Sequence, residues 1–284
     1  MKIIKIKILL IMIFVLGLQC KDGEKIIIEK TENKTTIILP SKLNEISGIV
    51  FSDDERLFCH DDEKASVYQI DPKTGKIIKT FFLGSWGVEA DFEDIAIAEN
   101  KFYLITSKGI LYEFEEGNDK EKVAFNIIDL KFSSKFEIEG LYYDDEYNSL
   151  LISTKDYAGK KYDDERAVYS FSLEKKQLAD KPRFLISLKQ LKKQYDIKDF
   201  FPSAITKHPV SKNFLILSSK GKPALIEISP SGKLLNGIKL SKSDHPQPEG
   251  IAVSKNGGIY ISDEADKKSP KLTYYKSFDA ILKN

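Results

Sequence analysis

Cysteine, histidine and tryptophan are scarce in this chain. Its 284 residues include two cysteines, three histidines and one tryptophan. Two cysteines cannot build the dense disulfide framework of small secreted domains, and no cysteines and histidines have the spacing of a zinc box. Nucleophile-elbow and phosphate-loop motifs are also missing. Stability must therefore come from a hydrophobic core, and the enzyme classes that carry these motifs are excluded.

An excess of charge of either sign is also missing. Lysine and arginine together number 44 and aspartate and glutamate 43, which gives a net charge of +1. These charges are spread along the chain instead of forming a basic tract, so no global field attracts nucleic acid. The sequence therefore predicts no nucleic-acid partner.

The one long apolar run lies at the N-terminus, over residues 8–18, and ends just before Cys20. Three lysines precede it, and it is too short to span a bilayer comfortably, which is typical of an export signal. A cysteine at this position resembles the lipidation site of bacterial lipoproteins. Gly17 and Gln19 depart from the usual residues there, so ordinary cleavage or an uncleaved anchor stays open.

We therefore divide the chain into three parts. Residues 1–20 are expected to be a signal peptide of lipoprotein type, 21–34 a tether, and 35–284 the folded domain. The expected location is the cell envelope, with the membrane as a partner through the lipid on Cys20.

A repeat runs through the folded domain. Glu-Gly-Ile and its variants (EISGI, DFEDI, EIEGL, FPSAI and QPEGI) recur along the chain, and we align them on one anchor position. The anchors are Gly48, Asp94, Gly140, Ala204 and Gly250. Their intervals are 46, 46, 64 and 46 residues, a period typical of propeller blades.

Each repeat reads as four short strands rich in β-branched and aromatic residues. The fifth repeat is one strand short, and residues 35–40 can supply it from the other end of the chain, which removes exposed edges. The longer interval contains an amphipathic stretch at 187–200, expected to be a helix between the third and fourth blades. The sequence predicts an all-β, five-bladed β-propeller, with six blades as the alternative.

The residue before each anchor is polar. In a propeller the first strand of a blade lines the central channel, so these five side chains should form one layer at one end: Ser47, Glu93, Glu139, Ser203 and Glu249. Three neighbouring carboxylates repel one another and raise their own pKa values. An all-oxygen set favours calcium over zinc, held by Glu93, Glu139 and Glu249. The alternative is that these glutamates bind no ion and accept hydrogen bonds from backbone N–H groups of neighbouring blades.

Loops after the second strands should surround the same channel mouth. They read His60-Asp61-Asp62, Ser107-Lys108, Lys155-Asp156, Ser219-Lys220 and Asp263-Glu264. Together with Ser47 and Ser203, we predict Asp61, Asp263 and His245 to contact a small molecule or protein there, although solvated loops would look the same.

With these motifs in view, above all QPEGIAVSKNGGIYISDEAD, the chain resembles the SdiA-regulated, YjiK-like family from about residue 35 onward. The resemblance implies a five-bladed propeller attached to the envelope, with a bound calcium ion as in some members. Asp94 departs from the small residue of the other repeats, which we expect to alter the entry of the second blade and to move Glu93.

Two functions follow. The first is a membrane-anchored recognition module without catalysis, in which calcium shapes the binding face. The alternative is a calcium-dependent hydrolase of lactonase-like or phytase-like type, which would need a base or an activated water beside a substrate pocket.

Overall fold

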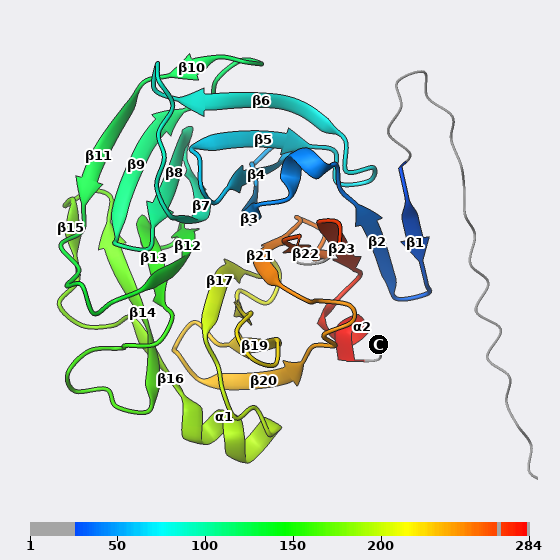
Figure 1. Ribbon diagram of the computed structural model, residues 1–284. Coiled ribbons are helices and arrows are strands. Elements are labelled where there is room, and N and C mark those ends of the chain that lie inside the picture. Colours follow the sequence, from blue (N-terminus) through cyan, green and yellow to red (C-terminus); the bar gives the residue numbers. More distant parts are fainter. Residues whose placement is uncertain (1–25, 266–267, 283–284) are drawn as a thin grey trace, which may run out of the picture.

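The computed structural model describes residues 26–265 and 268–282. Five antiparallel sheets surround a common axis like the blades of a propeller (Figure 1). We number the blades 1 to 5 in the order in which the anchors occur. The five-bladed architecture predicted from the 46-residue period is confirmed.

The first strand of each blade, which we call the inner strand, lies nearest the axis (Figure 1). Blade 1 contains β3 (Ile46–Phe51), β4 (Leu57–Asp61), β5 (Ser66–Ile70) and β6 (Ile77–Leu83). Blade 2 contains β7 (Phe92–Ala98), β8 (Lys101–Thr106), β9 (Ile110–Glu115) and β11 (Phe125–Asp129). Blade 3 contains β12 (Ile138–Asp144), β13 (Ser149–Thr154), β14 (Glu165–Ser172), β15 (Gln177–Leu178) and β16 (Phe184–Ser187). Blade 4 contains β17 (Pro202–Lys207), β18 (Phe214–Ser218), β19 (Ala224–Ile228) and β20 (Leu234–Lys239).

Blade 5 is built from both ends of the chain. Its first three strands are β21 (Pro248–Val253), β22 (Ile259–Asp263) and β23 (Lys271–Tyr275). The fourth strand is β2 (Lys34–Ile38), which pairs with β23. The predicted closure by an N-terminal strand is confirmed. A further strand, β1 (Ile28–Lys30), pairs with β2 inside the segment that the sequence assigned to a tether.

Apolar side chains between adjacent blades form the core. Five clusters of buried residues occupy the five blade interfaces, and each combines side chains from two neighbouring sheets. Between blades 1 and 2, for example, Phe58 and Phe81 pack edge-on against Phe102, with ring centroids 5.0 and 5.9 Å apart. Aromatic pairs of this geometry add to the stabilisation from area burial.

The predicted helix between blades 3 and 4 is present as α1 (Leu188–Tyr195). Ser187 is its N-cap, accepting a hydrogen bond from the N–H of Gln190, and Leu191 is its buried residue. The Tyr195 hydroxyl donates to the Leu235 carbonyl at 2.6 Å, which fixes the helix against β20. The other helical segments are η1 (Ser41–Leu43), which leads into β3, and α2 (Phe278–Leu282).

One strand joins two blades in a way that the repeat does not predict. The two-residue strand β10 (Lys122–Val123) lies between β9 and β11 of blade 2 but pairs in parallel with β6 of blade 1. It covers the outer edge of blade 1, which would otherwise expose unpaired backbone groups.

Every inner strand carries a β-bulge at the same place. The pairing register shifts between Ile46 and Ile49, between Phe92 and Asp94, and at the corresponding points of the other three blades. The residues left unpaired at these bulges include the five residues of the predicted polar layer. A bulge changes the direction of the side chain of its unpaired residue. Blade 2 has the same bulge as its neighbours, so Asp94 does not produce the expected difference in blade entry.

The small anchor residues are required by the close approach of neighbouring inner strands. A Cβ atom added to Gly48 would lie 2.0 Å from the Oδ1 atom of Asp94 and 2.9 Å from its Cα. At Gly250 it would lie 2.6 Å from the carbonyl oxygen of Ser47. The repeated glycine therefore permits blade-to-blade contact at the axis.

Candidate functional site

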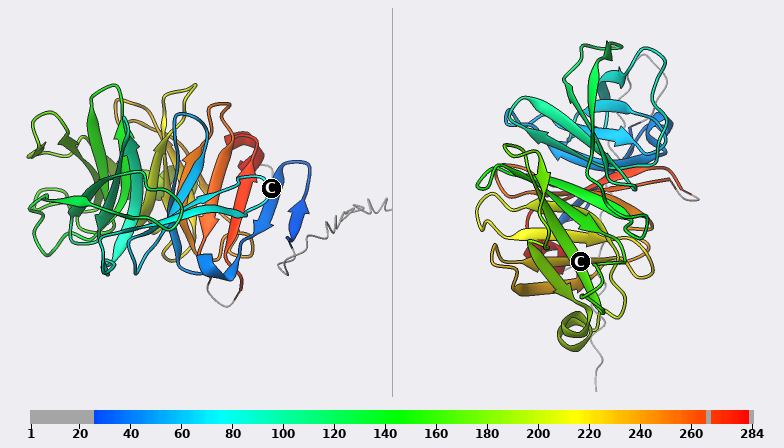
Figure 2. Two further views of the ribbon diagram at one scale, coloured as in Figure 1. Left: turned by 90° about the horizontal axis from the view of Figure 1, so that it is seen from above. Right: turned by 90° about the vertical axis from the view of Figure 1, so that its left-hand side faces the viewer.

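A cavity of about 190 Å³ opens at the end of the channel where the inner strands begin, which we call the mouth. It is lined by six carboxyl groups, one ammonium group and two further residues: Asp62, Asp91, Glu93, Glu139, Glu249, Glu264, Lys155, Ile46 and Ser47. Seen edge-on, η1 lies at this face of the ring (Figure 2, left). The bulges thus bring side chains from distant repeats to one axial cavity, as predicted for Glu93, Glu139 and Glu249.

These three glutamates and Lys155 form the axial cluster. Lys155 Nζ lies 2.6 Å from a carboxylate oxygen of Glu139, whose residue is 4% exposed. Lys155 belongs to the loop after β13, so the chain supplies its own counter-charge to the carboxylates. The metal-ligand role of Glu93, Glu139 and Glu249 stays a prediction.

The axial cluster holds protons tightly. Burial, and then the charge of Glu139, raises the pKa of Glu93 to about 10. Burial, and then the charges of Glu139 and Glu264, raises the pKa of Glu249 to about 8. The pKa of Glu139 is raised by burial, although Lys155 opposes the rise. At neutral pH part of the relief from repulsion is therefore protonation.

The two serines of the layer connect neighbouring blades. Ser47 of blade 1 donates a hydrogen bond to the Glu93 carbonyl of blade 2 at 2.7 Å, and Ser203 of blade 4 donates to the Pro248 carbonyl of blade 5 at 3.1 Å. Both serines are buried, and Ser47 also lines the cavity. Both hydroxyls thus have a structural role at the bulges.

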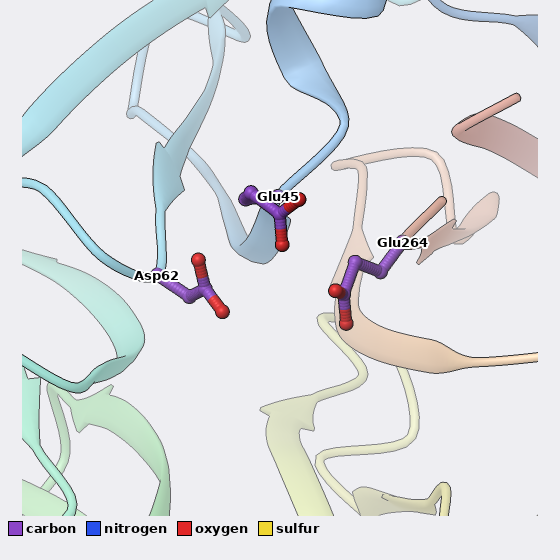
Figure 3. A group of neighbouring side chains, drawn as sticks. All are labelled: Glu45, Asp62 and Glu264. Atoms are coloured by element: carbon purple, nitrogen blue, oxygen red, sulfur yellow. The ribbon is translucent and has the colours of Figure 1, made fainter. Parts of the chain in front are cut away.

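A second acidic group lies at the mouth between blades 1 and 5, and we call it the outer triad (Figure 3). Glu45, Asp62 and Glu264 each offer a carboxylate oxygen, and these three atoms lie within 4.8 Å of one another. Backbone hydrogen bonds fix the loops that carry them: the Asp62 N–H donates to the Glu45 carbonyl at 3.1 Å, and the Ala265 N–H donates to the Asn44 carbonyl at 2.9 Å. The three carboxyl groups point toward a common space (Figure 3).

The outer triad fits a hard cation. Oxygens that bind calcium lie about 2.3–2.6 Å from the ion, so ligands on opposite sides are about 5 Å apart. The Oδ1 atom of Asp62 is buried and has no hydrogen-bond partner among the described residues. Burial, and then the charge of Glu45, raises the pKa of Asp62 to about 6, and burial raises that of Glu264 to about 8 with Glu45 as a hydrogen-bonded neighbour. This site therefore has crowded carboxylates and an unsatisfied acceptor.

Two of the predicted contact residues, Asp61 and Asp263, do not line the cavity. Asp61 accepts hydrogen bonds from the N–H groups of Glu63 and Lys64 at 3.2 and 2.9 Å, and so caps its own loop. Asp263 is fully buried. In both loops the next residue, Asp62 or Glu264, lines the cavity instead. Successive side chains of a strand point to opposite sides, so an error of one residue selects the wrong side.

His245 also lies inside the protein instead of at the cavity. It is 1% exposed, its Nδ1 lies 2.8 Å from Asp263 Oδ2, and its Nε2 lies 2.8 Å from the Tyr275 hydroxyl. The imidazole thus joins the loop before β21 to β22 and β23 within blade 5. This geometry corrects the prediction that His245 and Asp263 present their side chains to a ligand.

Sequence reasoning missed the outer triad, although a signal existed. Residues two positions after the second-strand site that faces the anchor form a further ring around the mouth: Asp62, Ser107, Lys155, Ser219 and Glu264. The acids of this ring lie only on blades 5 and 1, which are neighbours in a closed five-bladed ring. Glu45 precedes the polar layer by two residues in blade 1 and completes the group.

The predicted signal segment 1–20, with Cys20, lies outside the described residues. Among the helices that the structure does describe, none has the length and apolar character needed to cross a membrane.

Solved structures that superpose on this chain are only distantly similar to it in sequence. Glutaminyl cyclase from Myxococcus xanthus is 13% identical and superposes with a TM-score of 0.54, over 84% of this chain and 94% of the cyclase. A luciferin-regenerating enzyme is 12% identical with a TM-score of 0.51, over 83% and 92% of the two chains. A PQQ-bound aldose sugar dehydrogenase from Streptomyces coelicolor is 10% identical with a TM-score of 0.51, over 86% and 99%. These likenesses show the propeller fold alone.

No protein in the curated collection matches this sequence. The model of one protein family, described as SdiA-regulated, matches residues 29–273. This match covers the repeats, the axial cluster and the outer triad. The chain therefore belongs to the SdiA-regulated family.

Proposed function

We propose that the protein is an exported, membrane-anchored recognition module that binds a calcium ion at the mouth through Glu45, Asp62 and Glu264. The observation that carries this proposal is the outer triad, in which three carboxylate oxygens lie within 4.8 Å and a buried Asp62 oxygen has no partner. The pKa values of Asp62 and Glu264 are raised, and a divalent ion would relieve the same unfavourable crowding of carboxylates.

The outer triad is a better candidate than the axial cluster for the ion. Glu139 of the axial cluster is already paired with Lys155 at 2.6 Å. A calcium ion there would compete with an ammonium group that the protein itself supplies. Water and a bound ligand would complete the coordination at the outer triad, since calcium takes six to eight oxygens.

The rest of the mouth suits an anionic ligand or partner. Lys108, Lys155 and Lys220 occupy the loops of blades 2, 3 and 4, across the mouth from the triad. A calcium ion would cancel most of the negative charge of the triad, and its open coordination positions would accept anionic oxygens. The ligand that this arrangement favours has carboxylate, phosphate or sulfate groups.

Calorimetric titration of calcium into protein stripped with a chelator tests the site. We expect binding by the wild type, a loss of at least about tenfold in affinity for Glu264→Gln and Asp62→Asn, and a rise in melting temperature on calcium addition. Asp61→Asn is the matched control, because it removes the same charge next to Asp62 and an asparagine can still cap the loop. Absence of calcium binding, or equal loss in Asp61→Asn, would disprove the proposal.

The anchor would place the mouth near the membrane. The Ile38 N–H donates to the Ile27 carbonyl, so the described chain joins the sheet beside the end of β2 that leads to η1 and the mouth. The seven residue-to-residue steps from Cys20 to Ile27 span at most ~25 Å. Labelling with a fatty-acid analogue should mark the wild type in the membrane fraction and not Cys20→Ser; equal labelling of both would exclude lipidation at Cys20.

A calcium-dependent hydrolase is the second candidate. Its support is Glu249, which has a pKa of about 8 and lies close enough to Glu264 to feel its charge. A carboxyl with such a pKa could exchange a proton near neutral pH, and calcium would polarise a bound ester or phosphoester. Chelator-sensitive turnover of lactone or phosphomonoester substrates, lost in Glu249→Gln, would favour this function over recognition.

A further inference from the structure

A larger cavity lies at the opposite end of the channel from the mouth, and we call it the far cavity. Its volume is about 440 Å³. All five blades contribute the same part of their inner strands, namely residues 49–51, 95–97, 141–143, 205–207 and 251–253. These stretches follow the anchors, whereas the mouth residues precede them, so the two cavities occupy opposite ends of one axis. The volume is within the range of small-molecule sites.

The walls of the far cavity can contact both apolar and polar groups. Each inner strand is the terminal strand of its sheet, so its edge toward the axis has no neighbouring strand. Such an edge presents backbone N–H and C=O groups. Between these edges lie apolar side chains such as Val50, Ile97 and Val253. A ligand with a short apolar body and polar ends would match this lining.

The charges at the rim are separated by sign. Acids come from blades 1 to 3, and lysines come from blades 4 and 5: Asp53, Glu55, Glu99 and Asp145 against Lys212 and Lys255. All six side chains are exposed. Among the described residues neither ammonium group forms an ion pair with an acid, although the backbone N–H of Lys255 donates to the Glu55 carboxylate at 2.8 Å. A third lysine, Lys207, is already paired with Asp144 at 2.6 Å and does not contribute free charge.

We infer that the far cavity binds a zwitterionic small molecule, such as an amino acid or a short peptide, with its ammonium group toward the acids and its carboxylate toward Lys212 and Lys255. A simple cation or anion would meet one half of the rim and be repelled by the other half. A dipolar ligand meets both halves favourably. This inference uses none of the residues proposed to hold calcium, so it does not depend on the proposed function.

Two rim residues allow a clean test because of their backbone conformation. Glu99 has φ +57° and Lys212 has φ +61°, values that glycine adopts without strain. Glu99→Gly and Lys212→Gly therefore remove a charge without an expected loss of the fold. Lys120→Gly is the matched control, because Lys120 has φ +63° and does not line the far cavity.

The experiment is calorimetric titration at low ionic strength with the dipeptide leucyl-alanine, its N-acetyl derivative and its C-terminal amide. We expect the dipeptide to bind, and each blocked analogue to bind at least about tenfold more weakly. Glu99→Gly should reduce the difference in affinity between the dipeptide and the N-acetyl derivative. Lys212→Gly should reduce the difference in affinity between the dipeptide and the amide. Lys120→Gly should leave all affinities unchanged. Failure of the dipeptide to bind, equal binding of all three probes, or rim variants that behave like Lys120→Gly would overturn the inference.

Discussion

The carboxylate of Asp94 in blade 2 accepts a hydrogen bond from the backbone N–H of Leu141 in blade 3, with the two atoms 2.7 Å apart. Its other oxygen accepts from the N–H of Ile95 at 2.8 Å, and the residue is 2% exposed. The Leu141 N–H belongs to an inner strand, whose edge toward the axis has no strand partner. At this point of the channel Asp94 therefore supplies the hydrogen-bond acceptor that a neighbouring strand would otherwise provide.

Removing this acceptor should destabilise the protein. Asp94→Ala leaves two buried N–H groups unsatisfied, at about 1–3 kcal/mol each. Asp94→Asn keeps one carbonyl oxygen, which can still accept a hydrogen bond from one of the two N–H groups. Urea unfolding should show a clearly larger loss for Asp94→Ala than for Asp94→Asn. Equal losses would mean that the hydrogen bonds at Asp94 do not matter.

The axial cluster should make stability depend on pH. Glu249 has a pKa of about 8 in the folded protein and an ordinary value near 4.5 when unfolded, so between these values the folded state binds more protons. The free energy of unfolding must then fall as pH rises, by up to about 1.4 kcal/mol per pH unit for each such proton. In chelator, Glu249→Gln should show a shallower fall than the wild type between pH 6.5 and 8, measured by urea unfolding. Identical slopes would show that Glu249 does not hold this proton.

The ion pair between Lys155 and Glu139 should be essential at alkaline pH. Lys155→Met leaves the buried Glu139 carboxylate without its ammonium partner. Breaking a buried pair in this way lowers the free energy of unfolding by about 3–5 kcal/mol. At acidic pH the loss should be smaller, because Glu139 can take up a proton. The double variant Lys155→Met with Glu139→Gln should recover most of the stability at pH 8. If it were no more stable than Lys155→Met alone, the two residues would not be energetically coupled.

Truncations at the N-terminus should separate the two added strands of blade 5. A chain that begins at Lys34 loses β1, whose three residues are all exposed, and should melt within a few degrees of the full folded domain. A chain that begins at Pro40 also loses β2, which leaves β23 as an open edge beside a buried core. We expect the second chain to aggregate or to associate through that edge. Size-exclusion chromatography with thermal melting distinguishes the two, and a monomeric, stable Pro40 chain would contradict the closure.

The fold could be predicted because three of the four intervals between the anchors are 46 residues long. A strict period constrains every copy at once, so strand order, closure and the helix at α1 followed from residue types alone. The strand β10 could not be predicted, because nothing in the sequence around Lys122 and Val123 indicates that they pair with blade 1. Its pairing depends on how the loops of blade 2 pack in space.

The site was predicted in part for a related reason. Glu93, Glu139 and Glu249 share a repeat position, so their meeting on the axis followed from the alignment. The outer triad combines two different repeat positions, and its members became visible only once blades 1 and 5 were adjacent. Asp61 and Asp263 were chosen one residue too early, because the sequence alone does not fix which residue of a loop faces the channel.

The pairing of β2 with β23 has a consequence for how the molecule matures. Thr36 and Thr273 lie side by side in blade 5, yet 237 positions separate them in the polypeptide. Bringing such remote segments together is slow, because the entropy of a very large loop must be overcome first. During synthesis β2 therefore stays without its partner strand until β23 has been made. Until β2 pairs with β23, the outer edge of β23 is open and the ring is not closed.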